Sequence, residues 1–235
     1  MPYFYNIQDI NNGSLLFPAE PHLVIVLLLD TSSSMTGEAI NNLNKAINNF
    51  LGQVMTEDTI LKTLDIAIVG FGDSAYIVQD FVPFPLSRPI TLWVNNCTAM
   101  GEGINLAIDK VKERKCFYAK MGISYYEPWI FMITDGVPTD DISLARRRII
   151  EEENRKRFKF CAVGTPGYDK GILTSLTKRC MALDKTDFEN FFEWLICMLE
   201  DIPHAWKSPK QNFFELPGIA PELPSIESQV EIDWE

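Results

Sequence analysis

Three oxygen-bearing side chains stand together directly after an uninterrupted apolar run. The run covers residues 23–29, and Asp30, Ser32 and Ser34 follow it at intervals of two. Short carboxylate and hydroxyl side chains with this spacing can converge from one tight loop, and oxygen clusters of this kind bind hard divalent cations. The stretch therefore predicts one part of a metal site.

Two later stretches offer further oxygen ligands. Thr98 lies ahead of a Gly-containing segment that has helical periodicity, and Asp135 ends the apolar stretch at residues 129–134. The set resembles the metal-ion-dependent adhesion site of von Willebrand factor A (VWA) domains, in which Asp-x-Ser-x-Ser is completed by a threonine and an aspartate from two later loops. The resemblance implies that one divalent cation is bound by Asp30, Ser32, Ser34, Thr98 and Asp135, with Mg²⁺ expected ahead of Mn²⁺ or Ca²⁺.

The resemblance also implies a function. In the family the hydroxyls supply oxygens directly or through water, and the two carboxylates supply charge. Because Mg²⁺ requires about six ligands and dehydrates reluctantly, at least one water-filled position is left on the ion. In relatives an Asp or Glu of a partner protein takes this position, so the expected function is metal-dependent binding of a partner protein.

Three motifs indicate a branch of the family. They are Asp-Thr-Ser-x-Ser-Met-x-Gly-Glu from residue 30, Thr-Ala-Met-Gly-Glu-Gly-Ile from residue 98 and Ile-Thr-Asp-Gly-x-Pro-Thr-Asp from residue 133. They are similar to the bacterial intracellular group typified by the tellurite-resistance protein TerY, and the likeness covers about residues 22–200. It implies a cytoplasmic protein whose partner is a kinase, a phosphatase or a member of a stress-response assembly.

Each residue of the set also has a simpler interpretation. Asp30 and Ser32 could cap the helix that follows them, Thr98 could cap the next helix, and Asp135 could belong to a plain turn. The occurrence of all five residues in the family's order favours the metal site.

An enzyme is the main alternative function. A metal hydrolase or phosphotransferase could use the same acidic strand ends, but the chain has no phosphate-binding Gly-x-x-x-x-Gly-Lys loop and no Gly-x-Ser-x-Gly motif. It has only two histidines to act near neutral pH. We therefore expect a non-enzymatic protein; a structural subunit with a vestigial metal site is the third alternative.

Hydrophobic periodicity predicts the elements that position these residues. Short apolar runs at residues 23–29, 65–71, 129–134 and 158–163 are typical of strands buried on both faces of a parallel sheet. Amphipathic helices are expected between them, including a surface helix after Gly37 with an Asn-rich outer face and a helix that Asp140 and Asp141 could cap. The order predicts a doubly wound α/β fold, Rossmann-like, with helices on both faces.

One antiparallel edge strand is expected beside these. Residues 76–82 read as an extended segment, and Gly72-Asp73-Ser74 separates them from the run at residues 65–71. The last elements are a short helix near residues 172–178, a short strand at residues 180–183 and a final helix with a broad apolar face.

The chain divides into three parts by composition. Residues 1–21 are expected to form an irregular N-terminal arm, residues 22–200 the domain, and residues 201–235 a Pro-rich acidic tail. The apolar residues of the tail are spaced like those of a docking peptide, so the tail is expected either to be flexible or to pack on its own domain or on a partner.

The charge and the cysteine content argue against several classes of binding partner and bear on the expected cellular location. The net charge of −11 and the pI of about 4.7 argue against nucleic acid and anionic membranes, which would be repelled. No signal peptide or stretch of about 18 apolar residues is visible, and a cytoplasmic location is expected. Five cysteines without Cys-x-x-Cys spacing are expected to be reduced and mostly buried thiols.

Overall fold

The computed structural model describes residues 20–82, 87–183 and 186–205. Most of the expected N-terminal arm and C-terminal tail, including the tail residues spaced like a docking peptide, therefore lie outside the described residues. The last helix, α7 (Phe188–Ala205), continues past residue 200, where the tail was expected to begin. The division into arm, domain and tail stays a prediction.

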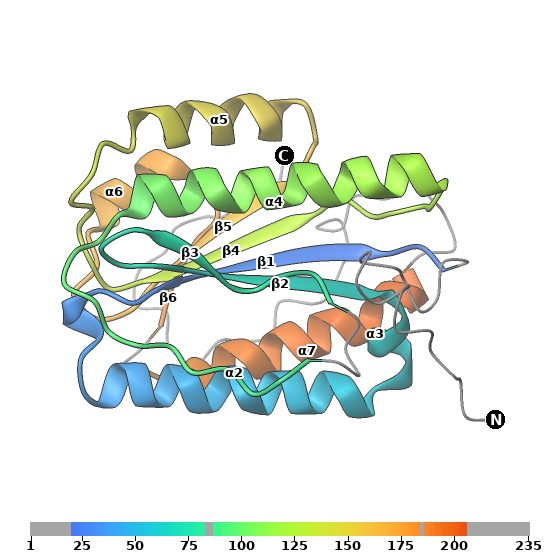
Figure 1. The fold of residues 1–235 in the computed structure, drawn as a ribbon, viewed down its shortest axis with the longest axis horizontal. Helices are drawn as coiled ribbons and strands as arrows, with labels where there is room; N and C mark the ends of the chain where they lie inside the picture. Colours follow the sequence, from blue (N-terminus) through green and yellow to red (C-terminus); the bar gives the residue numbers. More distant parts are fainter. Residues whose placement is uncertain (1–19, 83–86, 184–185, 206–235) are drawn as a thin grey trace.

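A six-stranded sheet with the order β3-β2-β1-β4-β5-β6 forms the centre of the fold. All strands run parallel except β3, which pairs antiparallel with β2 at one edge. The strands are β1 (Leu23–Asp30), β2 (Leu64–Phe71), β3 (Ala75–Gln79), β4 (Trp129–Thr134), β5 (Lys159–Gly164) and β6 (Cys180–Ala182). The sheet confirms the predicted fold class, and the carboxyl ends of its parallel strands lie on the left in Figure 1.

Strand β1 shows why both faces of the sheet are covered. Alternate residues of a strand point to opposite faces, and Leu23, Ile25, Leu27 and Leu29 belong to one apolar core while Val24, Val26 and Leu28 belong to the other. The first core is covered by α2 (Glu38–Thr56), α3 (Asp58–Thr63) and α7, and the second by α4 (Met100–Met121), α5 (Ser143–Asn154) and α6 (Lys170–Leu176) (Figure 1). None of the helices in the described ranges is long and apolar enough to cross a bilayer.

The predicted edge strand at residues 76–82 is shorter than expected and ends at Gln79. Asp80 follows outside the strand, and its carboxylate accepts hydrogen bonds from the Phe81 N–H at 2.7 Å and from the Lys110 ammonium at 2.8 Å. Phe81 then packs into the core beneath α4. The strand therefore stops where its next side chains are used to contact the helix.

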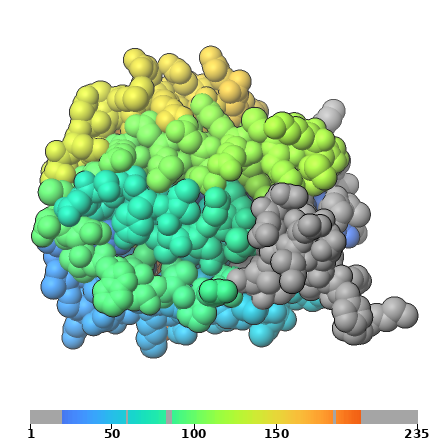
Figure 2. All heavy atoms as spheres, in the orientation of Figure 1, coloured from blue at the N-terminus to red at the C-terminus, as the bar shows by residue number. Residues whose placement is uncertain are grey.

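The stretch from residue 87 to residue 99 has no regular secondary structure, but it is bonded to α2. The Asn48 carboxamide donates to the Ile90 carbonyl at 2.8 Å and accepts from the Ile90 N–H at 2.9 Å. Asn44 makes the same pair of bonds with Leu92, at 3.1 and 2.7 Å. Two asparagines of the Asn-rich outer face of α2 thus hold the segment that leads to Thr98. In the space-filling view, the hairpin and this segment lie between α4 and α2 (Figure 2).

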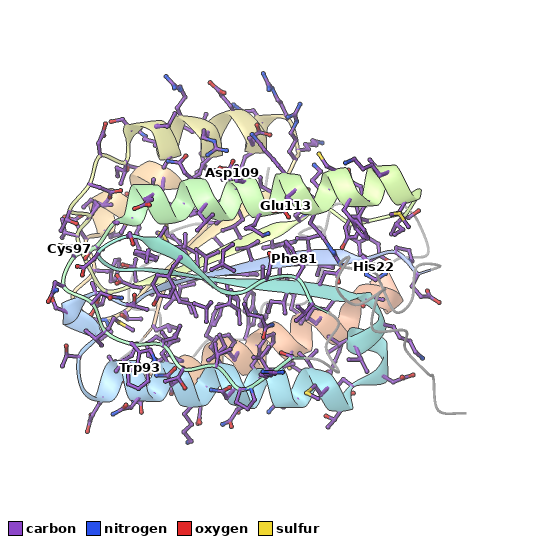
Figure 3. The ribbon with its side chains drawn as sticks, in the orientation of Figure 1. His22, Phe81, Trp93, Cys97, Asp109 and Glu113 are labelled. Atoms are coloured by element: carbon purple, nitrogen blue, oxygen red, sulfur yellow. The ribbon has the colours of Figure 1, made fainter. Side chains whose placement is uncertain are left out.

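A buried ionic cluster lies at the amino ends of β1 and β2. The Asp65 side chain contacts His22 Nδ1 at 3.0 Å and the Arg114 guanidinium at 3.1 Å, and it accepts a hydrogen bond from the Tyr118 hydroxyl. Burial alone would raise the pKa of the Asp65 carboxyl, but the contact with His22 and the charge of Arg114 outweigh it and lower that pKa. The Arg114 guanidinium also lies over the Phe81 ring, 5.2 Å from its centroid. Figure 3 places His22 toward the end of the sheet opposite Cys97, the neighbour of Thr98, with Phe81 between them.

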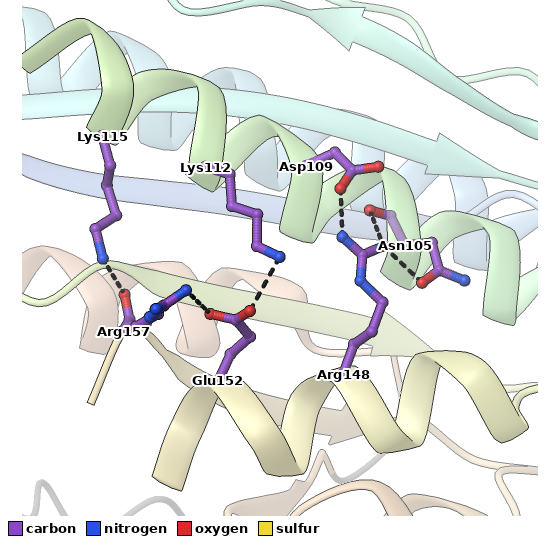
Figure 4. A network of polar contacts seen from close by, with 7 residues as sticks. All are labelled: Asn105, Asp109, Lys112, Lys115, Arg148, Glu152 and Arg157. Carbon is purple, nitrogen blue, oxygen red and sulfur yellow. Dashed lines mark hydrogen bonds and ion pairs between the residues drawn. The ribbon is translucent and has the colours of Figure 1, made fainter. Parts of the chain in front are cut away.

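Polar contacts join α4 to α5 on the outer side of the fold (Figure 4). Arg148 of α5 donates to the Asn105 Oδ1 atom at 2.7 Å and pairs with Asp109. Glu152, only 6% exposed, contacts the Lys112 ammonium of α4 at 3.0 Å. Because α4 follows Thr98 and α5 follows Asp135, the two loops that carry these residues are attached to a connected pair of helices.

Candidate metal site

Asp30 is the last residue of β1, and its side chain is buried at the carboxyl edge of the sheet. Its Oδ1 atom accepts a hydrogen bond from the Ser32 N–H at 2.8 Å, and its Oδ2 atom accepts one from Thr134 Oγ1 at 2.5 Å. Burial raises the pKa of the Asp30 carboxyl, the hydrogen bonds from Ser32 and Thr134 partly oppose this rise, and the nearby Asp135 carboxylate adds to it. The carboxylate is thus fixed in position, and its negative form is poorly stabilised by the protein alone.

Ser32 and Ser34 are brought together by the short 3₁₀ turn η1 (Ser33–Met35). Ser32 is extended, with φ −68° and ψ 170°, and the turn that follows places the two Oγ atoms 2.8 Å apart. Ser34 Oγ then donates to Asp135 Oδ1 at 2.6 Å. Met35 is fully buried and anchors the turn in the core. A chain of hydroxyl contacts therefore connects the loop after β1 with the loop after β4.

Thr98 joins the same region from the segment that precedes α4. It is 6% exposed, and its hydroxyl lies close to Gly136, the residue after Asp135. A Cβ atom built on Gly136 would lie 3.3 Å from Thr98 Oγ1 and 3.4 Å from Asp30 Oδ2. Because glycine has no side chain, the space between the Thr98 hydroxyl and the Asp30 carboxylate stays open.

The structure thus places all five predicted ligands at one edge of the sheet, on three loops. The simpler explanations fit less well, since the N-caps of α2 and α4 are Gly37 and Ala99 and neither helix has a side-chain cap at that position. The turn at Asp135 is not a plain one either, because its carboxylate accepts the Ser34 hydroxyl.

The donor set suits a hard divalent cation. It consists of two carboxylates and three hydroxyls, and oxygen ligands of this type favour Mg²⁺, Mn²⁺ or Ca²⁺ over softer metals. In the described part of the chain no Lys, Arg or His forms an ion pair with Asp30 or Asp135. No group of three or more His, Cys, Asp or Glu side chains that could hold a metal occurs among those residues. A cation at this edge would therefore depend on the hydroxyls as well as on the two carboxylates.

Two residues beside the site have roles that the sequence did not reveal. Asp140 was expected to cap the helix that follows it, but its carboxylate accepts hydrogen bonds from the Gly101 and Glu102 N–H groups at the start of α4, at 3.0 and 2.9 Å. Only Asp141 serves α5, where its Oδ1 atom accepts from the Ser143 N–H at 2.9 Å. Asp140 and Asp141 are adjacent acids, and nothing in the sequence distinguishes an acid that caps the following helix from one that caps a helix much earlier in the chain.

Asp73 of the β2–β3 turn holds the other side of the Thr98 segment. Its Oδ1 atom accepts hydrogen bonds from the Asn96 and Cys97 N–H groups at 3.0 and 2.9 Å. The bond from Cys97 is the main reason that the pKa of the Asp73 carboxyl is lowered. The Gly-Asp-Ser sequence predicted the turn, but not this contact with a residue 24 positions later.

The cysteines differ from the expectation of mostly buried thiols. All five are free, but Cys161 alone is buried, Cys180 is half-buried, and Cys97, Cys116 and Cys197 are exposed. Cys97 is exposed because it lies in the loop at the carboxyl edge, and the other two lie on outward positions of α4 and α7. Burial raises the pKa of the Cys180 thiol to about 11 and that of Cys161 further.

Comparison with known proteins gave one family and several solved folds. The profile of the von Willebrand factor type A domain matches residues 25–194. A search of curated proteins gave no significant match. Proximal thread matrix protein 1 from the mussel byssus is 15% identical with a TM-score of 0.50, over 80% of this chain and 46% of its own. The ArnB paralog VWA2 from Sulfolobus acidocaldarius is 17% identical with a TM-score of 0.50, over 78% of this chain and 45% of its own.

A third solved structure is matched over almost its full length. It is the vWF domain of the type V pili tip protein Mfa5 from Porphyromonas gingivalis, 11% identical with a TM-score of 0.53, over 76% of this chain and 96% of its own. The chain spans less than half of the mussel and Sulfolobus proteins. At these identities the likenesses establish the fold.

Proposed function

Because the chain belongs to the von Willebrand factor type A domain family, we propose that it is a metal-dependent protein-binding module. One observation carries the proposal: Asp30, Ser32, Ser34, Thr98 and Asp135 meet at the carboxyl edge of the sheet, with two carboxylates that no cationic side chain of the described residues neutralises. Such an arrangement is unfavourable by itself, since like charges are held close together. It becomes favourable when a divalent cation is bound.

Each proposed ligand has a distinct task. Asp30 and Asp135 supply two negative charges, which offset the charge of a divalent cation, and the three hydroxyls supply neutral oxygens. The hydrogen bonds from Ser32 N and Thr134 Oγ1 fix both oxygens of Asp30, so this ligand is oriented before binding. A bound Mg²⁺ would offer a remaining position to an Asp or Glu of the partner, because neutral hydroxyls leave it strongly electrophilic.

We propose further that the partner belongs to a bacterial cytoplasmic assembly linked to stress response, tellurite resistance or protein phosphorylation. The support is the similarity of the motifs from residues 30, 98 and 133 to those of the TerY-like group. The module itself is proposed to be non-enzymatic, with the metal acting in recognition.

Calorimetric titration tests the metal site. Wild-type protein is expected to bind one equivalent of Mg²⁺, and Mn²⁺ and Ca²⁺ with different affinities, whereas Asp30→Ala should abolish binding of all three. The thermal unfolding of the variant serves as the control for folding. Wild-type protein that binds none of the three ions would refute the proposal.

Affinity capture tests the partner. Tagged wild-type protein and the double variant Ser32→Ala, Ser34→Ala are incubated with a bacterial lysate, with Mg²⁺ or with a chelator. The partner is expected only with the wild-type protein and Mg²⁺, and a kinase, phosphatase or stress-response protein should be among the captured chains. A partner that binds equally well in chelator and to the double variant would contradict recognition through the metal.

A further inference from the structure

We infer that Thr139 and Asp140 are positioning residues for the proposed metal site, because they lock the loop that carries Thr98 to the loop that carries Asp135. We refer to these two residues as the loop latch. The inference rests on the proposed function, since it concerns how tightly the same five ligands hold a cation.

The first half of the loop latch is a reciprocal pair of hydrogen bonds. The Thr139 N–H donates to the Thr98 carbonyl at 2.9 Å, and the Thr98 N–H donates to Thr139 Oγ1 at 3.0 Å. Both backbone polar groups of a proposed ligand are thus bonded to one residue of the neighbouring loop. Any movement of Thr98 away from the Asp135 loop would break two hydrogen bonds at once.

The second half is the Asp140 carboxylate. Its two oxygens accept separately from the Gly101 and Glu102 N–H groups, at 3.0 and 2.9 Å, in the first turn of α4. A negative group at the start of a helix is favoured by the helix dipole, and hydrogen bonds to a charged acceptor are stronger than neutral ones. Asp140 thereby ties the Asp135 loop to the helix that begins two residues after Thr98.

Close approach of the two loops depends on the absence of a side chain at Gly101. A Cβ atom at this position would lie 2.7 Å from the Asp141 carbonyl oxygen and 3.0 Å from Asp140 Oδ2. Backbone at 2.7 Å cannot give way cheaply, so any larger residue would push the loops apart. The contact is therefore a packed one.

The loop latch joins the loops of Thr98 and Asp135 directly, whereas the other supports of the Thr98 segment reach elsewhere: the Asn95 N–H donates to the Thr31 carbonyl in the loop after β1. Asp73 holds Asn96 and Cys97 from the β2–β3 turn, which carries no proposed ligand. Loss of the loop latch would leave Thr98 attached to that turn but free to shift relative to Asp135. Removing partners that orient metal ligands typically weakens metal binding by about 10–100-fold, and we expect a loss of this size.

Titration of Mg²⁺ into the full chain tests the inference, with a control supplied by the sequence. Asp140→Asn and Thr139→Val are each expected to raise the Kd for Mg²⁺ by about 10–100-fold. Asp141→Asn removes the same charge one residue away, and Asp141 bonds to Ser143 of α5. The Asp141→Asn substitution should change the Kd for Mg²⁺ by less than about 3-fold, as expected for the loss of a screened surface charge. Thr139→Ser keeps a hydroxyl and should restore near wild-type affinity.

The outcomes separate positioning from stability and from charge. Thermal unfolding without metal is measured for every variant, and a merely structural role would lower the Tm and leave the Kd unchanged, which would overturn the inference. Equal weakening by Asp140→Asn and Asp141→Asn would overturn it as well, because charge alone would explain the result. If Asp140→Asn does not fold, the Kd of Thr139→Val compared with the Kd of Thr139→Ser decides the inference. Wild-type protein that binds no cation would refute the proposed function, whereas wild-type binding with an unchanged Kd in the latch variants would refute only the inference.

Discussion

Replacing Asp65 by Asn should destabilise the domain strongly. Asp65 is 6% exposed and is the counter-charge of Arg114, itself 6% exposed, with Nη2 of the guanidinium 3.1 Å from Oδ1 of Asp65. The substitution keeps the shape of the side chain but removes the Asp65 carboxylate from the buried Arg114 guanidinium. It also removes the charge that His22 and the Tyr118 hydroxyl contact.

The expected cost follows from burial. Removing one partner of a buried ion pair costs about 3–5 kcal/mol, because the other charge stays buried and uncompensated. For a domain of this size about 1 kcal/mol shifts the Tm by about 2–4 °C, so the Tm should fall by about 6–20 °C. The low pKa of Asp65 gives the sign of the pH dependence. Its contribution is fully present above the unfolded pKa of about 4 and is lost as the pH falls through the lower folded pKa, so the wild-type advantage should shrink below about pH 4.

Urea unfolding and thermal unfolding, followed by circular dichroism at several pH values, measure both effects. Asp58→Asn is the matched control, since Asp58 pairs with Lys62 on the surface and its side chain is 77% exposed. That substitution should cost less than about 1 kcal/mol. A loss for Asp65→Asn as small as the loss for Asp58→Asn, or a wild-type advantage that grows below about pH 4, would refute the reasoning.

Three further substitutions have expected outcomes. Asp30→Asn should raise the Tm of the metal-free protein, because a buried carboxylate with a raised pKa is replaced by a neutral group. It should also remove the gain in unfolding free energy, about 2.7 kcal/mol, that Mg²⁺ at 100 times its Kd is expected to give the wild-type protein. Thermal unfolding with and without Mg²⁺ measures both effects, and a lower Tm of the metal-free variant would contradict the prediction. Gly103→Ala should cost about 1–3 kcal/mol in urea unfolding, because its Cβ atom would lie 2.9 Å from Phe71 Cβ. Gly52→Ala on α2 is its control, with nothing within 4 Å, and should stabilise by about 0.5–1 kcal/mol; equal effects would exclude the packing argument. Asn48→Ala should cost about 1–3 kcal/mol and speed hydrogen exchange of the Ile90 N–H, which loses its acceptor; unchanged exchange would show that the acceptor is dispensable.

The sequence predicted the sheet well because its signals are local. The apolar run before Asp30 is buried on both faces, and a strand in that position needs apolar residues without alternation. The Gly72-Asp73-Ser74 stretch gave the antiparallel hairpin for a similar reason. Helix α3 was missed, because a helix of six residues is too short to show a period.

The positions of the site residues could be anticipated from topology. Loops after parallel strands emerge at the same edge of a sheet, so Asp30 and Asp135, at the ends of neighbouring strands β1 and β4, had to lie close together. What could not be anticipated is the set of long-range polar contacts. Asp140 bonds to Gly101 and Glu102, which lie 39 and 38 residues earlier, and Asp65 pairs with Arg114 of α4, much later in the chain. Hydrophobic periodicity carries no information about such pairs. The binding of metal by the five residues stays a prediction.

The contacts of Asn44 and Asn48 with the extended segment make α2 a substitute for a neighbouring strand. Each carboxamide supplies one donor and one acceptor, the same pair that a peptide group offers across a sheet. These hydrogen bonds hold the backbone of Ile90 and Leu92, and the side chain of the next residue, Trp93, points outward and is 74% exposed. Two residues later the Asn95 N–H is bonded to the Thr31 carbonyl, next to Ser32. The exposed indole of Trp93, five residues before Thr98 in the chain, is therefore a natural optical reporter, and its emission should shift to shorter wavelength when a partner covers it.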